Sequence, residues 1–225
     1  VWSLTRTGST VTFPGTTHTY IIQSGHTITL SASQTAAGVT IESGGILSPN
    51  GTRTLTAPLT INSGGTLNIT TRAYTQTGSL INNGSISGTT GQLIMGASSL
   101  TNGGSITLTT GQITRASGGT LTNSGSITMG AGTFSASSGI FTNQATGTLT
   151  ITGTAAVTLG TGNFVNNNTS ASVNFGSSTV GLTGTTRSVG GFVTTGAVNP
   201  SNASGTITIT GNINGAAFTK SGAGT

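Results

Sequence analysis

The chain has 225 residues, which include 38 glycines, and only 3% of the residues are charged. Glu42 is the only acidic residue, the formal net charge is +5, and there is no cysteine and no Lys/Arg cluster. This composition excludes disulfides, thiol catalysis, a Ser/His/Asp triad and Asp-rich calcium repeats, and it gives no basis for nucleic-acid binding.

Strands, not helices, are predicted along the whole chain. Apolar and polar residues alternate with a period of two in segments such as 27–30, 148–151 and 205–209. No window has the apolar stripe of an amphipathic helix, and no run approaches the roughly 20 apolar residues of a membrane span. We therefore expect an ordered all-β protein without a membrane span.

Residues 1–19 differ from the repeats that follow them. They contain the only tryptophan, Trp2, and a predicted strand at 9–13 with Val11 and Phe13 on one face. We expect this segment to cap the fold or to contact another subunit. Because the sequence starts at Val1 without an initiator Met, we also expect a processed, secreted chain.

Residues 20–204 repeat one phrase, in which apolar residues precede a polar position and a glycine corner. Successive polar positions are 19 to 28 residues apart. They are Gln23, Glu42, Asn62, Asn82, Asn102, Asn123, Asn143, Asn166 and Thr194. Three short strands and three corners use about 20 residues, so the period predicts a parallel β-helix of roughly nine coils.

The phase of the repeat changes part-way along the chain. In the first three phrases, the apolar residues lie three positions and one position before the polar residue. From Leu100 onward, the apolar residue lies two positions before the polar residue. With a period of two, this shift moves the polar residue from the outer face to the inner one. We predict a register change or bulge near residues 68–100, with the first three polar residues facing solvent. The later asparagines should form a hydrogen-bonded internal ladder, made of Asn82, Asn102, Asn123, Asn143 and Asn166.

The last part of the chain is less regular. After Asn166 the coils lengthen, and we expect Phe141, Phe164 and Phe192 to share one column of a wider core. Residues 205–225 are predicted to form a terminal strand or assembly segment. Its apolar residues, which we expect to contact another subunit, are Ile207, Ile209 and Phe218.

The phrases at 22–30 and 59–69 resemble those of secreted bacterial surface repeat proteins, namely filamentous-haemagglutinin-like adhesins and autotransporter passengers. The end of the chain, 218–225, is similar to the lead-in of an autotransporter-type strand repeat. The resemblance implies a right-handed β-helix at the cell surface that acts in adhesion or as an extracellular fibre. It transfers no catalytic residue.

The sequence offers little for chemistry. Glu42 lacks a second carboxylate, so we expect no enzyme activity. His18 and His26 have no acid or cysteine nearby in the sequence and are expected to face solvent without metal. Trp2, Tyr20 and Tyr74 could stack on sugars, but packing in the core or in an end cap is favoured. We therefore expect no cofactor.

Two functions fit these observations. The first is a structural subunit of an extracellular fibre, in which copies of the chain add strands to one another head to tail. The second is a monomeric adhesin segment that binds glycans or other surfaces through its Thr- and Asn-rich flank. A polysaccharide-degrading β-helix is disfavoured by the lack of acidic residues.

Overall fold

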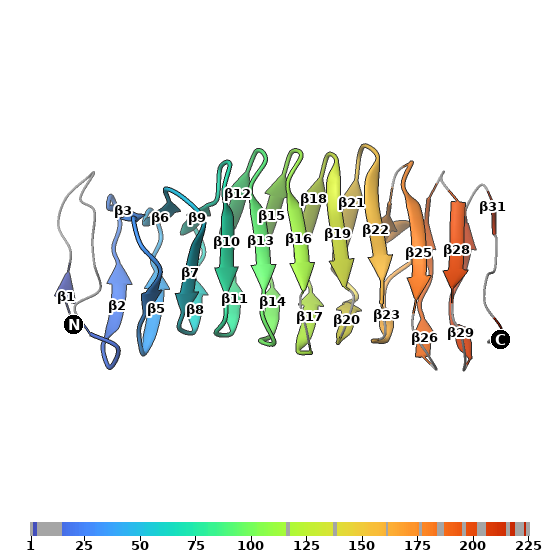
Figure 1. Cartoon of the computed structure of the whole chain (residues 1–225), viewed down its shortest axis with the longest axis horizontal. Helices are drawn as coiled ribbons and strands as arrows, with labels where there is room; N and C mark the ends of the chain where they lie inside the picture. Colours follow the sequence, from blue (N-terminus) through green and yellow to red (C-terminus); the bar gives the residue numbers. More distant parts are fainter. Residues whose placement is uncertain are drawn as a thin grey trace.

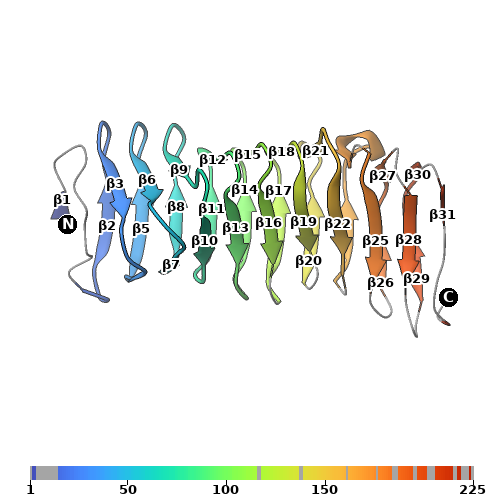
Figure 2. The same ribbon diagram turned by 45° about the horizontal axis from the view of Figure 1, so that its top comes forward.

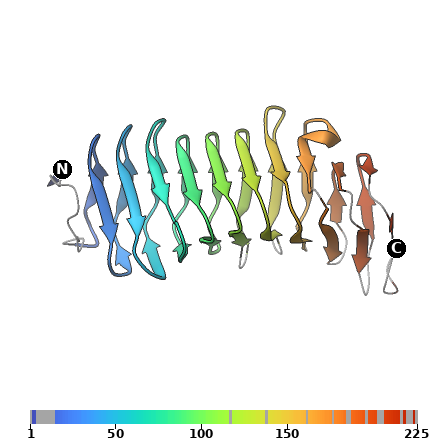
Figure 3. The same cartoon turned by 90° about the horizontal axis from the view of Figure 1, so that it is seen from above.

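The computed structural model describes residues 2–3, 15–115, 118–136, 139–160, 162–175, 177–183, 187–194, 197–201, 206–214, 217–218 and 223. The described chain winds into an elongated stack, with β1 and β31 at opposite ends (Figure 1). Two further views show the same stack, with successive strands side by side along its length (Figures 2 and 3).

The strands form three sheets, which we name A, B and C. In stacking order, sheet A contains β1 (Trp2–Ser3), β2 (Thr19–Ile22), β5 (Gly38–Ile41), β8 (Leu59–Ile61), β11 (Leu80–Asn82), β14 (Leu100–Asn102), β17 (Thr120–Asn123), β20 (Ile140–Asn143), β23 (Phe164–Asn166), β26 (Arg187–Val189) and β29 (Ile207–Ile209).

Sheet B follows A along each turn. It contains β3 (Thr27–Leu30), β6 (Ile46–Pro49), β9 (Thr66–Asn68), β12 (Ser85–Gly88), β15 (Ser105–Leu108), β18 (Ser126–Met129), β21 (Thr148–Ile151), β24 (Val173–Asn174), β27 (Phe192–Val193) and β30 (Ile213–Asn214). A short 3-10 helix, η1 (Ser170–Ser172), precedes β24.

Sheet C completes each turn. It contains β4 (Gln34–Thr35), β7 (Arg53–Thr56), β10 (Ala73–Gln76), β13 (Gln92–Met95), β16 (Gln112–Arg115), β19 (Gly132–Ala136), β22 (Ala155–Leu159), β25 (Thr179–Thr183), β28 (Ala197–Ser201) and β31 (Ala217–Phe218).

This arrangement is a parallel β-solenoid, which confirms the predicted fold class. Each neighbouring pair is parallel, as in β2–β5 and β14–β17, and eight successive turns from β2 to β25 place one strand in each sheet. The offset between paired residues is about 20, as in Leu80↔Leu100. The remaining strands extend the sheets beyond these eight turns. The right hand of the coil stays a prediction.

The core fills the inside of the coil because every second strand residue points inward. Strand β3 shows this alternation, with Ile28 and Leu30 buried between half-buried threonines. The corners need glycine where backbones approach closely. A Cβ on Gly45 would lie 2.4 Å from the carbonyl oxygen of Ile22, one turn earlier, and the adjacent Gly44 has a φ of +75°.

The later turns have an aromatic core, but its arrangement differs from the predicted single column. Phe141 pairs with Phe164 in sheet A and their rings stack at 4.9 Å, as expected. The next residue in that column is Val189, whereas Phe192 lies in sheet B. The prediction was wrong because the lengthened turn after Asn166 places Phe192 in the next strand. Its ring still lies beside the aromatic core, with 6.4 Å between the ring centroids of Phe192 and Phe164.

Candidate assembly surfaces and internal ladder

The five predicted ladder asparagines lie in one column at the end of their sheet A strands. Each side chain donates its Nδ2–H to the Oδ1 of the next, with N···O distances of 2.7, 2.8, 2.9 and 3.0 Å. The first four side chains are fully buried and Asn166 is half-buried. In order along the stack they are Asn82, Asn102, Asn123, Asn143 and Asn166.

The same amides also bind the backbone at the corner between sheets A and B. Nδ2 of Asn102 donates to the carbonyl of Ser126 at 3.1 Å, and Nδ2 of Asn123 donates to that of Thr148 at 3.0 Å. An amide has two N–H donors, so one serves the next asparagine and the other serves a corner carbonyl. The ladder therefore joins successive turns and satisfies polar backbone groups inside the coil.

The phase change lies in a corner, not in a strand. Sheet A keeps its register, with Ile61 paired to Asn82, so the ladder continues a column that begins with Ile22, Ile41 and Ile61. Gln23 and Asn62 are exposed and Glu42 is half-buried. The predicted difference in facing is therefore present, but the bulge predicted near 68–100 is absent from the paired strands of sheet A across this point.

A shorter corner produces the change of phase. Ile61 is followed by the next inner residue, Leu67, after six positions, whereas Asn82 is followed by Ile86 after four. The longer corner turns through Gly64, whose φ is +81°. In the shorter corner the amide N–H of Gly84 donates to Asn82 Oδ1 at 3.2 Å. An asparagine side chain thus supports the tight corner from inside.

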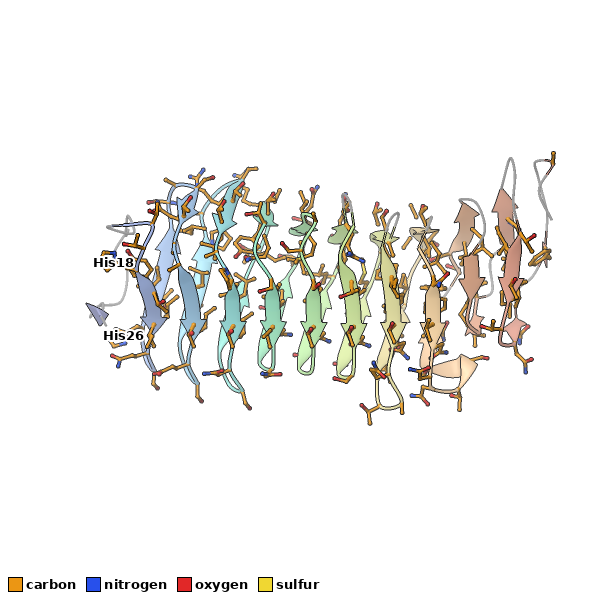
Figure 4. All side chains as sticks on the ribbon, turned by 90° about the horizontal axis from the view of Figure 1, so that it is seen from below. His18 and His26 are labelled. Carbon is orange, nitrogen blue, oxygen red and sulfur yellow. The ribbon has the colours of Figure 1, made fainter. Side chains whose placement is uncertain are left out.

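The ionisable residues singled out in the sequence do not come together. Within the described residues, no group of three or more His, Cys, Asp or Glu side chains could hold a metal ion. His18 and His26 both lie at the end of the stack near β1 (Figure 4). His18 is exposed and His26 is half-buried, in the corner position that Gly45 occupies one turn later. Glu42 lies at the following corner.

Both tyrosines lie in the core, as the sequence favoured. Tyr20 is buried, and its hydroxyl donates to the carbonyl of Gly15 at 3.0 Å. Tyr74 is fully buried and donates to Gln76 Oε1 at 2.6 Å, while Gln76 Nε2 donates to the carbonyls of Ala57 and Gly78. Neither ring is available to stack on a sugar. The side chain of Trp2 lies outside the described residues.

Burial of Tyr74 makes the stability of the solenoid sensitive to alkaline pH. Desolvation raises the pKa of Tyr74 above its usual value of 10.0, because the buried phenolate is disfavoured. The pKa of Tyr74 is higher in the folded state than in the unfolded state. Its contribution to the free energy of unfolding is therefore fully present below pH 10 and is lost as the pH rises above 10. We expect the urea midpoint to fall as the pH rises from 10 to 12, and to fall less in Tyr74→Phe. An equal fall in both proteins would contradict this assignment.

Arg115 is a buried cation that the sequence analysis did not single out. It follows Gln76 and Met95 in one inner column of sheet C, and its side chain is fully buried. Its guanidinium donates to the carbonyls of Gly118 and Ile140, the latter at 3.3 Å. Burial lowers its pKa. Its inward-facing position two residues after Ile113 was the signal that could have identified it.

The end of the stack near β31 exposes part of the core. Ile209 in β29 pairs with the buried Val189, and Phe218 in β31 pairs with the buried Val198, so both belong to inward-facing columns. Their side chains are nevertheless 42% and 55% exposed. Ile207 is half-buried against the core. These three predicted assembly residues therefore lie together on the terminal turn.

The opposite end begins with β1. Trp2 pairs with Tyr20 and Ser3 with Ile21, so the segment predicted to contact another subunit adds a parallel strand to sheet A. Val11 and Phe13, with the strand predicted at 9–13, lie outside the described residues. Among the described residues, β1 and β29 are the two outermost strands of sheet A.

Comparison with protein families, curated proteins and solved structures finds no match to this chain. No helix among the described residues is long and apolar enough to cross a membrane. The β-solenoid fold rests on the parallel pairing of the strands in the three sheets.

Proposed function

We propose that the chain is a structural subunit of an extracellular bacterial fibre, assembled head to tail by addition of β-strands between copies. The observation that carries this proposal is the exposed end of the core. Phe218 continues a column of sheet C in which Val157, Val180 and Val198 are buried, and Ile209 follows the buried Val189 in a column of sheet A. Both side chains are nevertheless about half exposed. Stacking another turn on this end would bury them.

The physical character of the stack favours association with a second copy. All three sheets are parallel and uninterrupted, so their outermost strands present backbone donors and acceptors along the stack axis. The chain has seven charged residues among 225, and charge is the usual means by which proteins prevent such edges from pairing. A contact between two different ends is heterologous and propagates into a filament unless it closes into a ring.

The extracellular setting rests on the sequence. A cysteine-free chain rich in Gly, Thr and Asn, with phrases that resemble filamentous-haemagglutinin-like adhesins and autotransporter passengers, fits secretion to a bacterial surface. In this proposal the partner is the chain itself, and no enzyme activity, cofactor or nucleic acid is involved.

Removal of residues 1–13 should abolish fibre formation, because it deletes β1, the outermost strand of sheet A at that end. The measurement is electron microscopy of the purified protein, with circular dichroism to verify that the strands remain. Ala145→Ser, a change at an exposed corner residue, is the matched control and should leave fibres intact. Fibres of normal length from the truncated chain would refute the role of this segment.

An adhesin that binds glycans through its flank is the second candidate. The outer face of sheet B supports it, because this face presents a long row of hydroxyl side chains at successive strands. The row comprises Ser85, Ser105, Ser126 and Thr148. Single short rods in the microscope, together with retention on immobilised polysaccharide, would favour this function over the fibre.

A further inference from the structure

The two outermost strands of sheet A define how one copy would meet the next. Building on the proposed fibre, we infer that β29 of one copy pairs in parallel with β1 of the following copy, with Ile209 opposite Trp2 and Thr210 opposite Ser3. Sheet A would then run through the junction without interruption. The partner is a second copy of this chain, and the contact is a single defined register.

The register follows from the inward-facing column of sheet A. This column passes from Trp2 to Tyr20 and continues through paired residues to Val189 and Ile209. Its members, from Tyr20 to Val189, are buried. Ile209 is the last described member of the column and Trp2 is the first. Continuing the column across the junction places these two residues opposite each other.

Alternation along the strands excludes neighbouring registers. A slip of one residue would place Trp2 opposite Thr208 or Thr210, both exposed, so the inward-facing column of one copy would meet an outward-facing column of the next. A slip of two residues keeps the alternation but places Ile207 or Gly211 opposite Trp2, so that neither residue of β1 lies opposite the 42%-exposed Ile209. The proposed register is the one that covers Ile209.

The other two sheets support a stacked junction over a sideways one. Ile213 in β30 pairs with the buried Phe192 and is itself packed against the core, and Phe218 in β31 is 55% exposed. Ile209, Ile213 and Phe218 therefore come from sheets A, B and C of the same terminal turn. A second copy stacked along the axis would approach all three, whereas a lateral contact through one sheet would not.

Cysteine cross-linking tests the register, and the absence of native cysteine makes the result unambiguous. Paired residues of adjacent strands lie about 4.8 Å apart, within the Cα···Cα range of a disulfide. The variant with Ser3→Cys and Thr210→Cys should form a ladder of covalent multimers on oxidation. Mixing the two single variants should give covalent heterodimers only, because a disulfide forms only where β29 of a Thr210→Cys copy meets β1 of a Ser3→Cys copy, and each chain has one thiol.

The matched control is Ser3→Cys combined with Thr208→Cys, in which the two Cα atoms would lie about 8 Å apart and beyond bridging distance. We expect cross-linking at least about tenfold slower than in the 3/210 variant. Fibres that cross-link through 3/208, or through neither pair, would overturn this register and leave the proposed fibre standing. Absence of both fibres and cross-links from the unmodified and variant chains would overturn the fibre as well.

Discussion

Replacement of Asn123 by alanine is expected to lower the free energy of unfolding by roughly 3–5 kcal/mol, because it removes the middle of the ladder. Asn123 accepts a hydrogen bond from Asn102 at 2.8 Å and donates to Asn143 at 2.9 Å and to the Thr148 carbonyl at 3.0 Å. All three asparagine side chains are fully buried, so water cannot replace the lost partner. The truncation also leaves a cavity in the column.

Two substitutions serve as controls for this loss. Asn62→Ala changes the same residue type in the same repeated phrase, but Asn62 is exposed, and Thr122→Ala changes the outward-facing neighbour in β17. Each should lower the free energy of unfolding by less than about 0.5 kcal/mol. The measurement is urea unfolding followed by circular dichroism, compared through midpoints because a solenoid need not unfold in one step. If Asn62→Ala destabilised the protein as much as Asn123→Ala, the buried ladder would contribute no more to stability than an exposed asparagine does.

Much of the fold could be predicted because the constraints of a solenoid recur in every turn. A period of about 20 residues and an alternation of two specify three parallel strands per turn, and the structure contains them. The inward position of Asn102 and Asn123 followed from the same alternation. In a stack, a residue's neighbours are its own equivalents one turn away, so one sequence period carries both local and long-range information.

The errors arose where this repetition fails. The change of phase predicted a register change or bulge near residues 68–100, whereas sheet A stays in register and pairs Asn82 with Ile61, because the following corner is two residues shorter. A corner length depends on which backbone groups a side chain can satisfy, and the alternation of strands does not encode it. Phe192 was misplaced for a related reason. The turn that contains η1 is longer, so the residue one turn after Phe164 in sheet A is Val189, and Phe192 lies in the next strand.

Buried polar residues in sheet C were missed for a different physical reason. Gln76 and Arg115 stand at inward positions of otherwise ordinary strands, and the pattern gives their facing but not their partners. Whether such a residue is tolerated depends on carbonyl oxygens that other turns bring near it, such as those of Ala57 and Ile140. Those contacts exist only once the corners are built.

Arg115→Glu is expected to destabilise the solenoid by roughly 4–5 kcal/mol, because it replaces a buried donor by a buried acceptor. The guanidinium of Arg115 donates to the carbonyl oxygens of Gly118 and Ile140, and a carboxylate there would be repelled by both. The site cannot expand easily, since a Cβ on Gly139 would already lie 2.9 Å from the guanidinium. Differential scanning calorimetry should show a large fall in the melting temperature.

Arg115→Met separates the loss of charge from the loss of volume. Met95 occupies the preceding position of the same column and is fully buried, so an unbranched apolar side chain is compatible with it. The substitution removes the cost of burying a cation, since the only acidic side chain, Glu42, lies three turns away, but it leaves two carbonyls without this donor. We expect these effects to cancel to within about 1.5 kcal/mol. A loss as large as that of Arg115→Glu would mean that the hydrogen bonds of Arg115, and not the sign of its charge, determine the stability of this corner.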